Sequence, residues 1–309
     1  MSELVEFWER PSRVRTLIAG WQQWADAGDV SSGLPNYLID LIGARPFGRL
    51  VPGGYYLFQI PTGHHLMRPV VKLAEGHVER MDEKGNEFYC VGDAEDGLAI
   101  FLGDEPQLNH EQYADAFLDA VQALGVERVV VLAGVYGAVP YDKDREVSCV
   151  YSLPRLKAEL RDYAVRFSNY EGGTTICTYI VYAAEQRDIE IVGFTSLVPS
   201  YDFSQTGVSV QPVVIGEDYK AWYDLMVRVN HMLGLAIDLS DLQEQARDLI
   251  ASWNDKLHQL AHNMPELGVD EFLQRVRSEF RERPFAPLGD VWIEGLKDLF
   301  DDTTEEDEP

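Results

Sequence analysis

Two apolar segments constrain the fold of this chain more than any other feature of its sequence. The segments read VVVLAGV (129–135) and IVGFTSLV (191–198). In a strand, successive residues point to opposite faces, and both segments carry apolar residues on both faces. Strands of this kind are usually buried on both faces, as in parallel or mixed sheets that are covered by helices. The two segments therefore predict a sheet that lies between layers of helices.

Other apolar segments alternate with helical patterns through the first two-thirds of the chain. In the pattern of residues 109–125, Asn109 is the expected N-cap and Gly125 the expected end of the helix. Its apolar face is formed by Ala114, Phe117, Leu118, Val121 and Leu124. The expected strands are 13–21, 55–60, 87–92, 97–103, 127–135, 175–183 (ambiguous) and 189–198. This alternation predicts the α/β class, as a doubly wound sandwich.

Helical patterns replace the alternation near residue 217. Residues 217–235 form one helical pattern, and Ser240 is the expected N-cap of a second helix with an apolar stripe. Two more helices are expected at 269–281 and 289–300. The predicted organisation is an α/β sandwich domain (1–216), a helical C-terminal segment packed on it or extending from it (217–300), and a disordered acidic tail (301–309).

The charge balance of the chain is strongly acidic. There are 52 Asp and Glu residues against 26 Lys and Arg, which gives a formal net charge of −26. A protein binds phosphate backbones or anionic lipids through clustered basic residues. The nearest approach to such a cluster, RVRSEFRER (275–283), carries interleaved acids. We therefore expect neither a nucleic-acid nor a membrane partner.

The cysteines and histidines point to a cytoplasmic protein without a metal or a cofactor. Cys90, Cys149 and Cys177 are widely spaced and form no Cys-x-x-Cys pair, which is typical of structural thiols in a reducing compartment. No apolar run approaches the roughly 20 residues of a membrane helix, and the N-terminus lacks an apolar signal core. His258 and His262 lie four residues apart, but no third ligand has a recognisable spacing.

Acidic residues cluster where strands are expected to end. Asp26 and Asp29 lie in AGWQQWADAGDVSSG (19–33), where a strand leads into a helix. Similar positions are held by Asp104, Glu105, Glu171 and Asp202. Either these residues cap helices and stabilise turns, or a pair of them faces a pocket and performs acid–base chemistry. Without a P-loop or dinucleotide pattern, a phosphate cradle is the weakest interpretation. For residues 19–33 we favour a capping aspartate and packed tryptophans.

Aromatic residues near the same strand ends are candidates for a binding surface. They are Trp21, Trp24, Tyr136, Tyr170 and Tyr201. The segment 132–146 is expected to be a third strand end, where the buried strand emerges at Gly134 and leads into a loop. This loop either makes Tyr136 and Tyr141 available to a ligand or is a plain surface loop.

Several motifs occur together in one order along residues 13–260. They are the turn G-W-x-x-W-x-D-A-G-D (20–29), the turn G-x-E-P (103–106), a Val-Pro pair ending at Pro140, and YEGG (170–173). The chain thereby resembles the proteasome assembly chaperone 2 family, in its bacterial branch, although Gly173 stands where that family carries proline. The resemblance implies a three-layer α/β/α sandwich similar to nucleoside phosphorylases, which assembles as a homo-oligomer, usually a trimer.

Two functional hypotheses follow. The first is a non-catalytic, homo-oligomeric, chaperone-like protein without cofactors, which acts on an unknown protein partner. The alternative is a hydrolase of nucleoside-like or other small polar substrates, with Asp26 or Asp29 as base and Glu105 or Glu171 as partner. Carboxylates that converge in an enclosed pocket would favour the hydrolase, and carboxylates that cap helices or face solvent would favour the binding protein.

Overall fold

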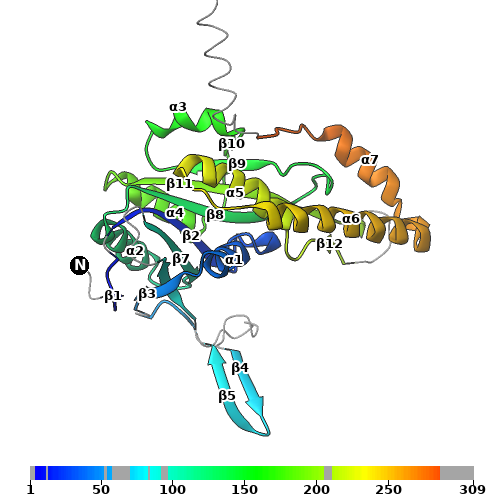
Figure 1. Cartoon of the computed structure of the whole chain (residues 1–309). Coiled ribbons are helices and arrows are strands. Elements are labelled where there is room, and N and C mark those ends of the chain that lie inside the picture. Colours follow the sequence, from blue (N-terminus) through cyan, green and yellow to red (C-terminus); the bar gives the residue numbers. More distant parts are fainter. Residues whose placement is uncertain are drawn as a thin grey trace, which may run out of the picture.

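A mixed ten-stranded sheet runs through the molecule (Figure 1). The computed structural model describes residues 4–11, 13–51, 54–57, 70–82, 84–91, 97–204 and 211–285. In spatial order the strands are β1 (Val5–Phe7), β3 (Arg45–Leu50), β6 (Asn86–Cys90), β7 (Gly97–Asp104), β2 (Val14–Gln22), β8 (Arg128–Gly137), β11 (Glu190–Tyr201), β9 (Val147–Tyr151) and β10 (Arg166–Phe167), and β12 (Val213–Val214) pairs with β11.

The four central strands, β7, β2, β8 and β11, are parallel to one another. Their register places Ile18 beside Ile100 of β7 and Val130 of β8. Their carboxyl ends therefore meet at one edge of the sheet. Strand β8 is buried on both faces, because Val130 belongs to the core on one side of the sheet and Val131 to the core on the other.

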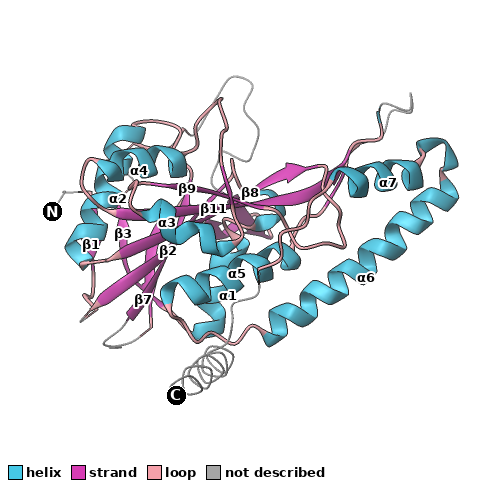
Figure 2. Ribbon diagram, turned by 90° about the horizontal axis from the view of Figure 1, so that it is seen from above, coloured by secondary structure: helices cyan, strands magenta, loops and turns pink. Residues whose placement is uncertain are grey.

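Helices cover both faces of the sheet (Figure 2). One face carries α1 (Gly33–Ile42), α3 (Leu156–Leu160), α5 (Tyr219–Leu233), α6 (Ser240–Asn263) and α7 (Val269–Glu279). The other face carries α2 (His110–Leu124) and α4 (Ile176–Glu185). Short 3₁₀ turns are η1 (Ala27–Asp29), η3 (Arg161–Tyr163) and η5 (Pro265–Leu267). The predicted α/β class is confirmed.

The turn that follows β2 lies directly on the sheet, and two glycines make room for it. A Cβ atom at Gly20 would lie 1.8 Å from the carbonyl oxygen of Ser31, and one at Gly134 would lie 2.0 Å from that of Ala27. No side chain fits at such distances, so the backbone of the turn can approach the strands only where they carry glycine. This close approach fixes the position of the first turn of α1 against the sheet.

Several local predictions are wrong. Residues 175–183 are helical, because Thr175 Oγ1 accepts a hydrogen bond from the Thr178 amide and the buried residues Ile176, Ile180 and Ala184 recur every four positions. The side chain of Asn109 does not cap α2; its amide donates to the carbonyl of Gly54.

Two further corrections concern the predicted second C-terminal helix and the predicted strand at 55–60. The side chain of Ser240 does not cap α6; its amide and hydroxyl both donate to Asp238. Residues 55–57 lie outside the strands, and residues 58–60 lie outside the described part of the chain.

The helical C-terminal part is present and shares the core of the sheet. Helix α5 packs beside α1, where the indole Nε1 of Trp222 donates to the carbonyl of Gly28 at 2.9 Å. Helix α6 runs past the end of the sheet (Figure 2). Phe272 of α7 packs against Tyr201, the last residue of β11, and against Phe203, which follows that strand. The predicted helix at 289–300 and the tail at 301–309 lie outside the described residues.

A separate two-stranded hairpin projects from the body of the molecule (Figure 1). It consists of β4 (Val70–Ala74) and β5 (His77–Asp82). The register pairs Val71 with Met81 and Leu73 with Val78. A register shift between Lys72 and Leu73 makes Glu79 an extra residue of β5, so Val78 and Met81 can share a face although they are three positions apart. Because side chains alternate along β4 and paired residues share a face, the four apolar side chains occupy one face of the hairpin. Lys72 and Arg80, which pair with each other, occupy the opposite face.

Candidate functional site

A cavity lies beside the carboxyl ends of β2 and β7. These strands are neighbours, and their last residues, Gln22 and Asp104, are partners in the register. The chain leaves β2 towards α1 on one face of the sheet and leaves β7 towards α2 on the other. In open α/β sheets ligands bind where the connections diverge in this way.

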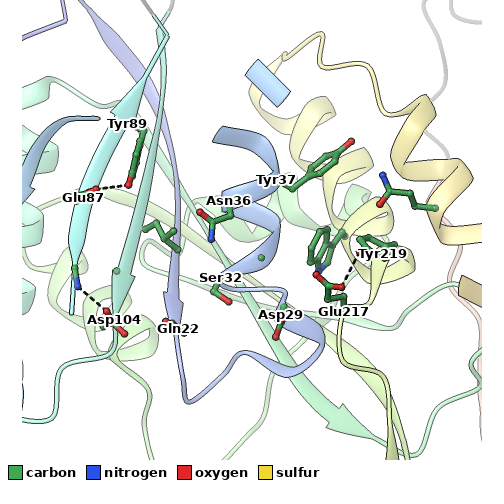
Figure 3. A pocket seen from close by; sticks show the side chains of 16 residues that line it. Gln22, Asp29, Ser32, Asn36, Tyr37, Glu87, Tyr89, Asp104, Glu217 and Tyr219 are labelled. Atoms are coloured by element: carbon green, nitrogen blue, oxygen red, sulfur yellow. Dashed lines mark hydrogen bonds between the residues drawn. The ribbon is translucent and has the colours of Figure 1, made fainter. Parts of the chain in front are cut away.

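The cavity has a volume of about 570 Å³ and a polar, acidic and aromatic lining. Its carboxylates are Asp29, Glu87, Asp104 and Glu217; its aromatic residues are Tyr37, Tyr89, Tyr219 and Trp222; its amides are Gln22, Asn36 and Gln245. Figure 3 shows Glu87, Tyr89 and Asp104 on one side and Asp29, Glu217 and Tyr219 on the other, with Ser32 and Asn36 of the α1 region between them. The volume is in the range typical of small-ligand pockets.

The two acidic sides of the cavity differ in how their charge is compensated. Asp104 accepts hydrogen bonds from Lys84 Nζ at 2.7 Å and from the amide of Gly85 at 2.9 Å. On the opposite side, Glu217 accepts a hydrogen bond from the Tyr219 hydroxyl at 3.1 Å. Burial, and then the nearby charge of Glu217, raise the pKa of Asp29 above its usual value. The Asp29–Glu217 pair is thus a concentration of negative charge.

Asp26, the other acid of the opening turn, has a structural role. Its Oδ1 accepts from the amides of Ser31 and Ser32 at 2.7 and 2.9 Å, and its Oδ2 accepts from the Ser32 hydroxyl at 2.6 Å. Asp26 therefore satisfies the amides that precede α1. Burial raises its pKa, and the hydrogen bonds from the two serines oppose that shift.

Glu105 also binds backbone amides instead of facing the cavity. Its Oε1 accepts from the amide of Ile176 at 2.9 Å, at the start of α4, and the amide of Trp24 is a second donor. Burial raises its pKa. Glu171 is exposed, and the exposed Asp202 accepts from the amide of Ser204. The proposed catalytic carboxylates do not converge on one pocket.

The aromatic candidates divide into buried and exposed residues. Trp21 is 3% exposed and donates from Nε1 to the Tyr113 hydroxyl at 2.7 Å, and the fully buried Tyr201 donates to the carbonyl of Val139. These two residues belong to the core and do not form a surface. Trp24, Tyr136 and Tyr170 are exposed, which corrects the expectation that both tryptophans of the opening turn pack.

The segment 132–146 contributes Arg145 to a buried ion pair that the sequence did not reveal. Arg145 donates from Nε and Nη2 to both carboxylate oxygens of Asp218, at 2.8 and 3.1 Å, and both side chains have no exposed surface. Tyr141, expected to be available to a ligand, is buried and donates to Asn254. Neither interpretation of this segment involved Arg145, and nothing in the local sequence indicated a partner 73 residues away.

Two of the three cysteines, Cys149 and Cys177, are buried. Within the described part of the chain, no group of three His, Cys, Asp or Glu side chains is placed to hold a metal. Burial raises the pKa of Cys149 and of Cys177 to about 12, which keeps both thiols protonated and unreactive near neutral pH. Among the helices of the described residues, none has the length and apolarity to cross a membrane.

Together, the fold and the cavity define an α/β sandwich protein with a polar pocket at the carboxyl edge of its parallel strands. The model of the PAC2 family matches residues 20–256, and the chain belongs to this family. The family resemblance seen in the sequence is thereby confirmed. No curated protein matches the sequence.

Solved structures with the same fold come from bacteria and archaea. A PAC2 family protein of Streptomyces avermitilis is 26% identical (TM-score 0.65), with coverage of 84% of this chain and 99% of that one. A proteasome-assembly chaperone homologue of Mycobacterium tuberculosis is 23% identical (TM-score 0.67; coverage 78% and 94%). PbaB of Pyrococcus furiosus, an archaeal proteasome activator, is 19% identical (TM-score 0.58; coverage 81% and 97%).

Proposed function

We propose that this chain is a non-catalytic protein that forms a homotrimer, binds a protein partner and assists the assembly of that partner in the cytoplasm. Two of the similar structures are named as a proteasome-assembly chaperone homologue and a proteasome activator, which supports a protein partner. The formal charge of −26 suits a partner with a basic surface, because complementary charge accelerates encounter and selects partners.

The projecting hairpin is the observation that carries the proposal. Val71, Leu73, Val78 and Met81 form its apolar face, and each of these side chains is between 45% and 58% exposed. An isolated two-stranded hairpin is only marginally stable in water, and an exposed apolar face of this kind marks a contact surface. The hairpin is thus suited to pack its apolar face against another protein chain.

Exposed aromatic residues at the carboxyl edge of the sheet provide a second surface. Trp24 and Tyr170 are 73% and 76% exposed, and Tyr136 is 49% exposed. Trp24 follows β2, Tyr136 lies near the end of β8, and Tyr170 precedes α4, which Glu105 ties to the end of β7. Large aromatic side chains are enriched in protein interfaces.

The positions of the candidate catalytic acids do not support the hydrolase alternative. Asp26 and Glu105 bind backbone amides, and Glu171 is exposed, so that of the four candidate catalytic acids only Asp29 lines the cavity. General acid–base catalysis on a glycosidic or similar bond needs two carboxyl groups at one substrate, and none of the predicted pairs of base and partner has both members in the lining of this cavity.

Sedimentation equilibrium tests the oligomeric state. We expect a mass close to three times that of the 34.9 kDa chain. A concentration-independent monomer would contradict the homo-oligomer.

A charge placed on the apolar face of the hairpin tests the partner surface. L73E should abolish recovery of the partner in affinity capture from native lysate, because it inserts a carboxylate into the apolar face. A74E is the matched control, since Ala74 lies on the opposite face of the same strand and receives the same charge. Equal recovery with both variants, or no partner with the wild-type chain, would refute the proposal.

A further inference from the structure

We propose that the cavity beside β2 and β7 binds an organic cation, an ammonium or guanidinium group, between Asp29 and Glu217. This site is separate from the hairpin and from the exposed aromatic residues. Its ligand is defined by three features of the cavity: its place in the fold, its charge and its aromatic wall.

The cavity lies where open α/β sheets commonly bind ligands. It opens where the connections from two adjacent parallel strands diverge to opposite faces of the sheet. Its volume of about 570 Å³ exceeds what a single metal ion needs and suits a ligand of several heavy atoms. Its walls come from β2, β6, β7, α1, α5 and α6, so it is formed by the tertiary fold and not by one loop.

The charge of the cavity selects a cation. Asp29 and Glu217 line the same side of the cavity, where both residues are exposed to solvent (Figure 3). Among the described residues that line the cavity there is no Lys, Arg or His to compensate them. Asp104, on the other side, is already paired with Lys84. An anionic ligand would add a third negative charge on this side, whereas a cation would relieve the repulsion.

The aromatic wall favours an organic cation. The partly exposed Tyr219 lines the cavity next to Glu217, and the buried Trp222 supports it edge to face with ring centroids 4.9 Å apart. Aromatic faces attract ammonium and guanidinium groups, and a carboxylate beside the ring strengthens the site. The indole of Trp222 also donates to the carbonyl of Gly28, so the wall is tied to the turn that carries Asp29. The two parts of the site are therefore held in place before a ligand binds.

The cation can come from two sources with the same chemistry. It is either a free small amine or guanidine, or an Arg or Lys side chain that a polypeptide inserts into the cavity. Isothermal titration calorimetry on the full chain separates the two, with propylguanidine as the free cation and acetyl-arginine methylamide as the presented side chain, because both carry a single positive charge. Acetyl-citrulline methylamide, which has nearly the same shape without the charge, is the negative control.

Substitutions of the two carboxylates test whether binding occurs in this cavity. D29N and E217Q should each weaken the cation by about tenfold or more, the usual effect of losing one charge-assisted hydrogen bond. E185Q is the matched control, because Glu185 is exposed on α4, on the opposite face of the sheet, and its loss changes the net charge equally. The two variants lie on different elements and remove like charges, so we expect both to fold.

The outcomes are distinct. Tighter binding of propylguanidine assigns the site to a free small cation, and tighter binding of the capped arginine assigns it to a polypeptide side chain. The proposal is overturned if neither cation binds at millimolar concentration, if the citrulline compound binds equally well, or if D29N and E217Q bind like E185Q. Such a failure would leave the hairpin results, and with them the proposed function, untouched.

Discussion

Removal of the buried Arg145 is the sharpest test of how this fold is stabilised. Arg145 forms two hydrogen bonds with Asp218, and its Nη1 donates to the carbonyls of Tyr141 and Lys143 at 3.0 and 2.9 Å. Asp218 also accepts from the amide of Ala221 and so begins α5. One guanidinium thereby joins the loop after β8 to the helix that forms a wall of the cavity.

The expected cost of R145M follows from this geometry. Methionine fills much of the volume but leaves Asp218 as a buried charge without its partner, together with carbonyls that lose their donor. Breaking a buried ion pair in this way costs about 3–5 kcal/mol, which is a large part of the roughly 5–15 kcal/mol by which a typical domain is stable. R145M/D218N should be more stable than R145M, because asparagine removes the buried charge and keeps a side-chain oxygen for the Ala221 amide.

Urea denaturation followed by circular dichroism measures these differences. The matched control is R155M, because Arg155 pairs with Asp188 at an exposed position where both side chains are more than half exposed. An exposed pair contributes roughly 0–1 kcal/mol. If R145M destabilises the protein no more than R155M, or if adding D218N to R145M lowers stability further, the buried pair is not the stabilising feature described above.

Three further predictions concern the turn after β2 and its neighbours. G20A should prevent folding, since its Cβ would overlap a backbone carbonyl, whereas G173A, in open space, should leave the melting temperature nearly unchanged. E105Q should keep the fold but lower the free energy of unfolding by about 1 kcal/mol, because a neutral amide oxygen accepts more weakly from Ile176 than a carboxylate does; an unchanged urea midpoint would contradict this. Burial raises the native pKa of Asp26, so its contribution to stability is present at low pH and is lost as the pH rises from the ordinary carboxyl pKa through that raised value. Urea titrations of the wild-type chain should show this decline of the unfolding free energy, and D26N should flatten it; parallel curves for the two chains would refute the assignment.

The order of strands and helices along the chain could largely be predicted from the sequence, because it depends on the spacing of apolar residues. The apolar runs at 129–135 and 191–198 became the doubly buried strands β8 and β11. Gly125 ends α2 in the left-handed conformation expected of a terminal glycine. At 175–183 short-range composition was ambiguous, since β-branched residues suit strands while the burial of Ile176, Ile180 and Ala184 follows a helical period.

The roles of the acidic residues depended on the tertiary structure. Asp26 and Asp29 are three positions apart in one turn, yet the first binds the amides that precede α1 and the second faces Glu217, 188 residues further along the chain. Glu105 meets Ile176 across 71 residues, and Arg145 meets Asp218 across 73. A carboxylate has the same chemistry in every turn, and its role is set by the amides, cations or acids that other elements bring to it.

The sequence by itself therefore determined the class of fold, its family and the places where polar chemistry gathers, because hydrophobic period and turn motifs are local properties of the chain. Only the tertiary structure decided which acids became caps, which remained uncompensated in a cavity, and which apolar side chains were left exposed on a projecting hairpin. The physical reason is that burial and charge compensation are properties of contacts, and most of these contacts join residues that are distant in sequence.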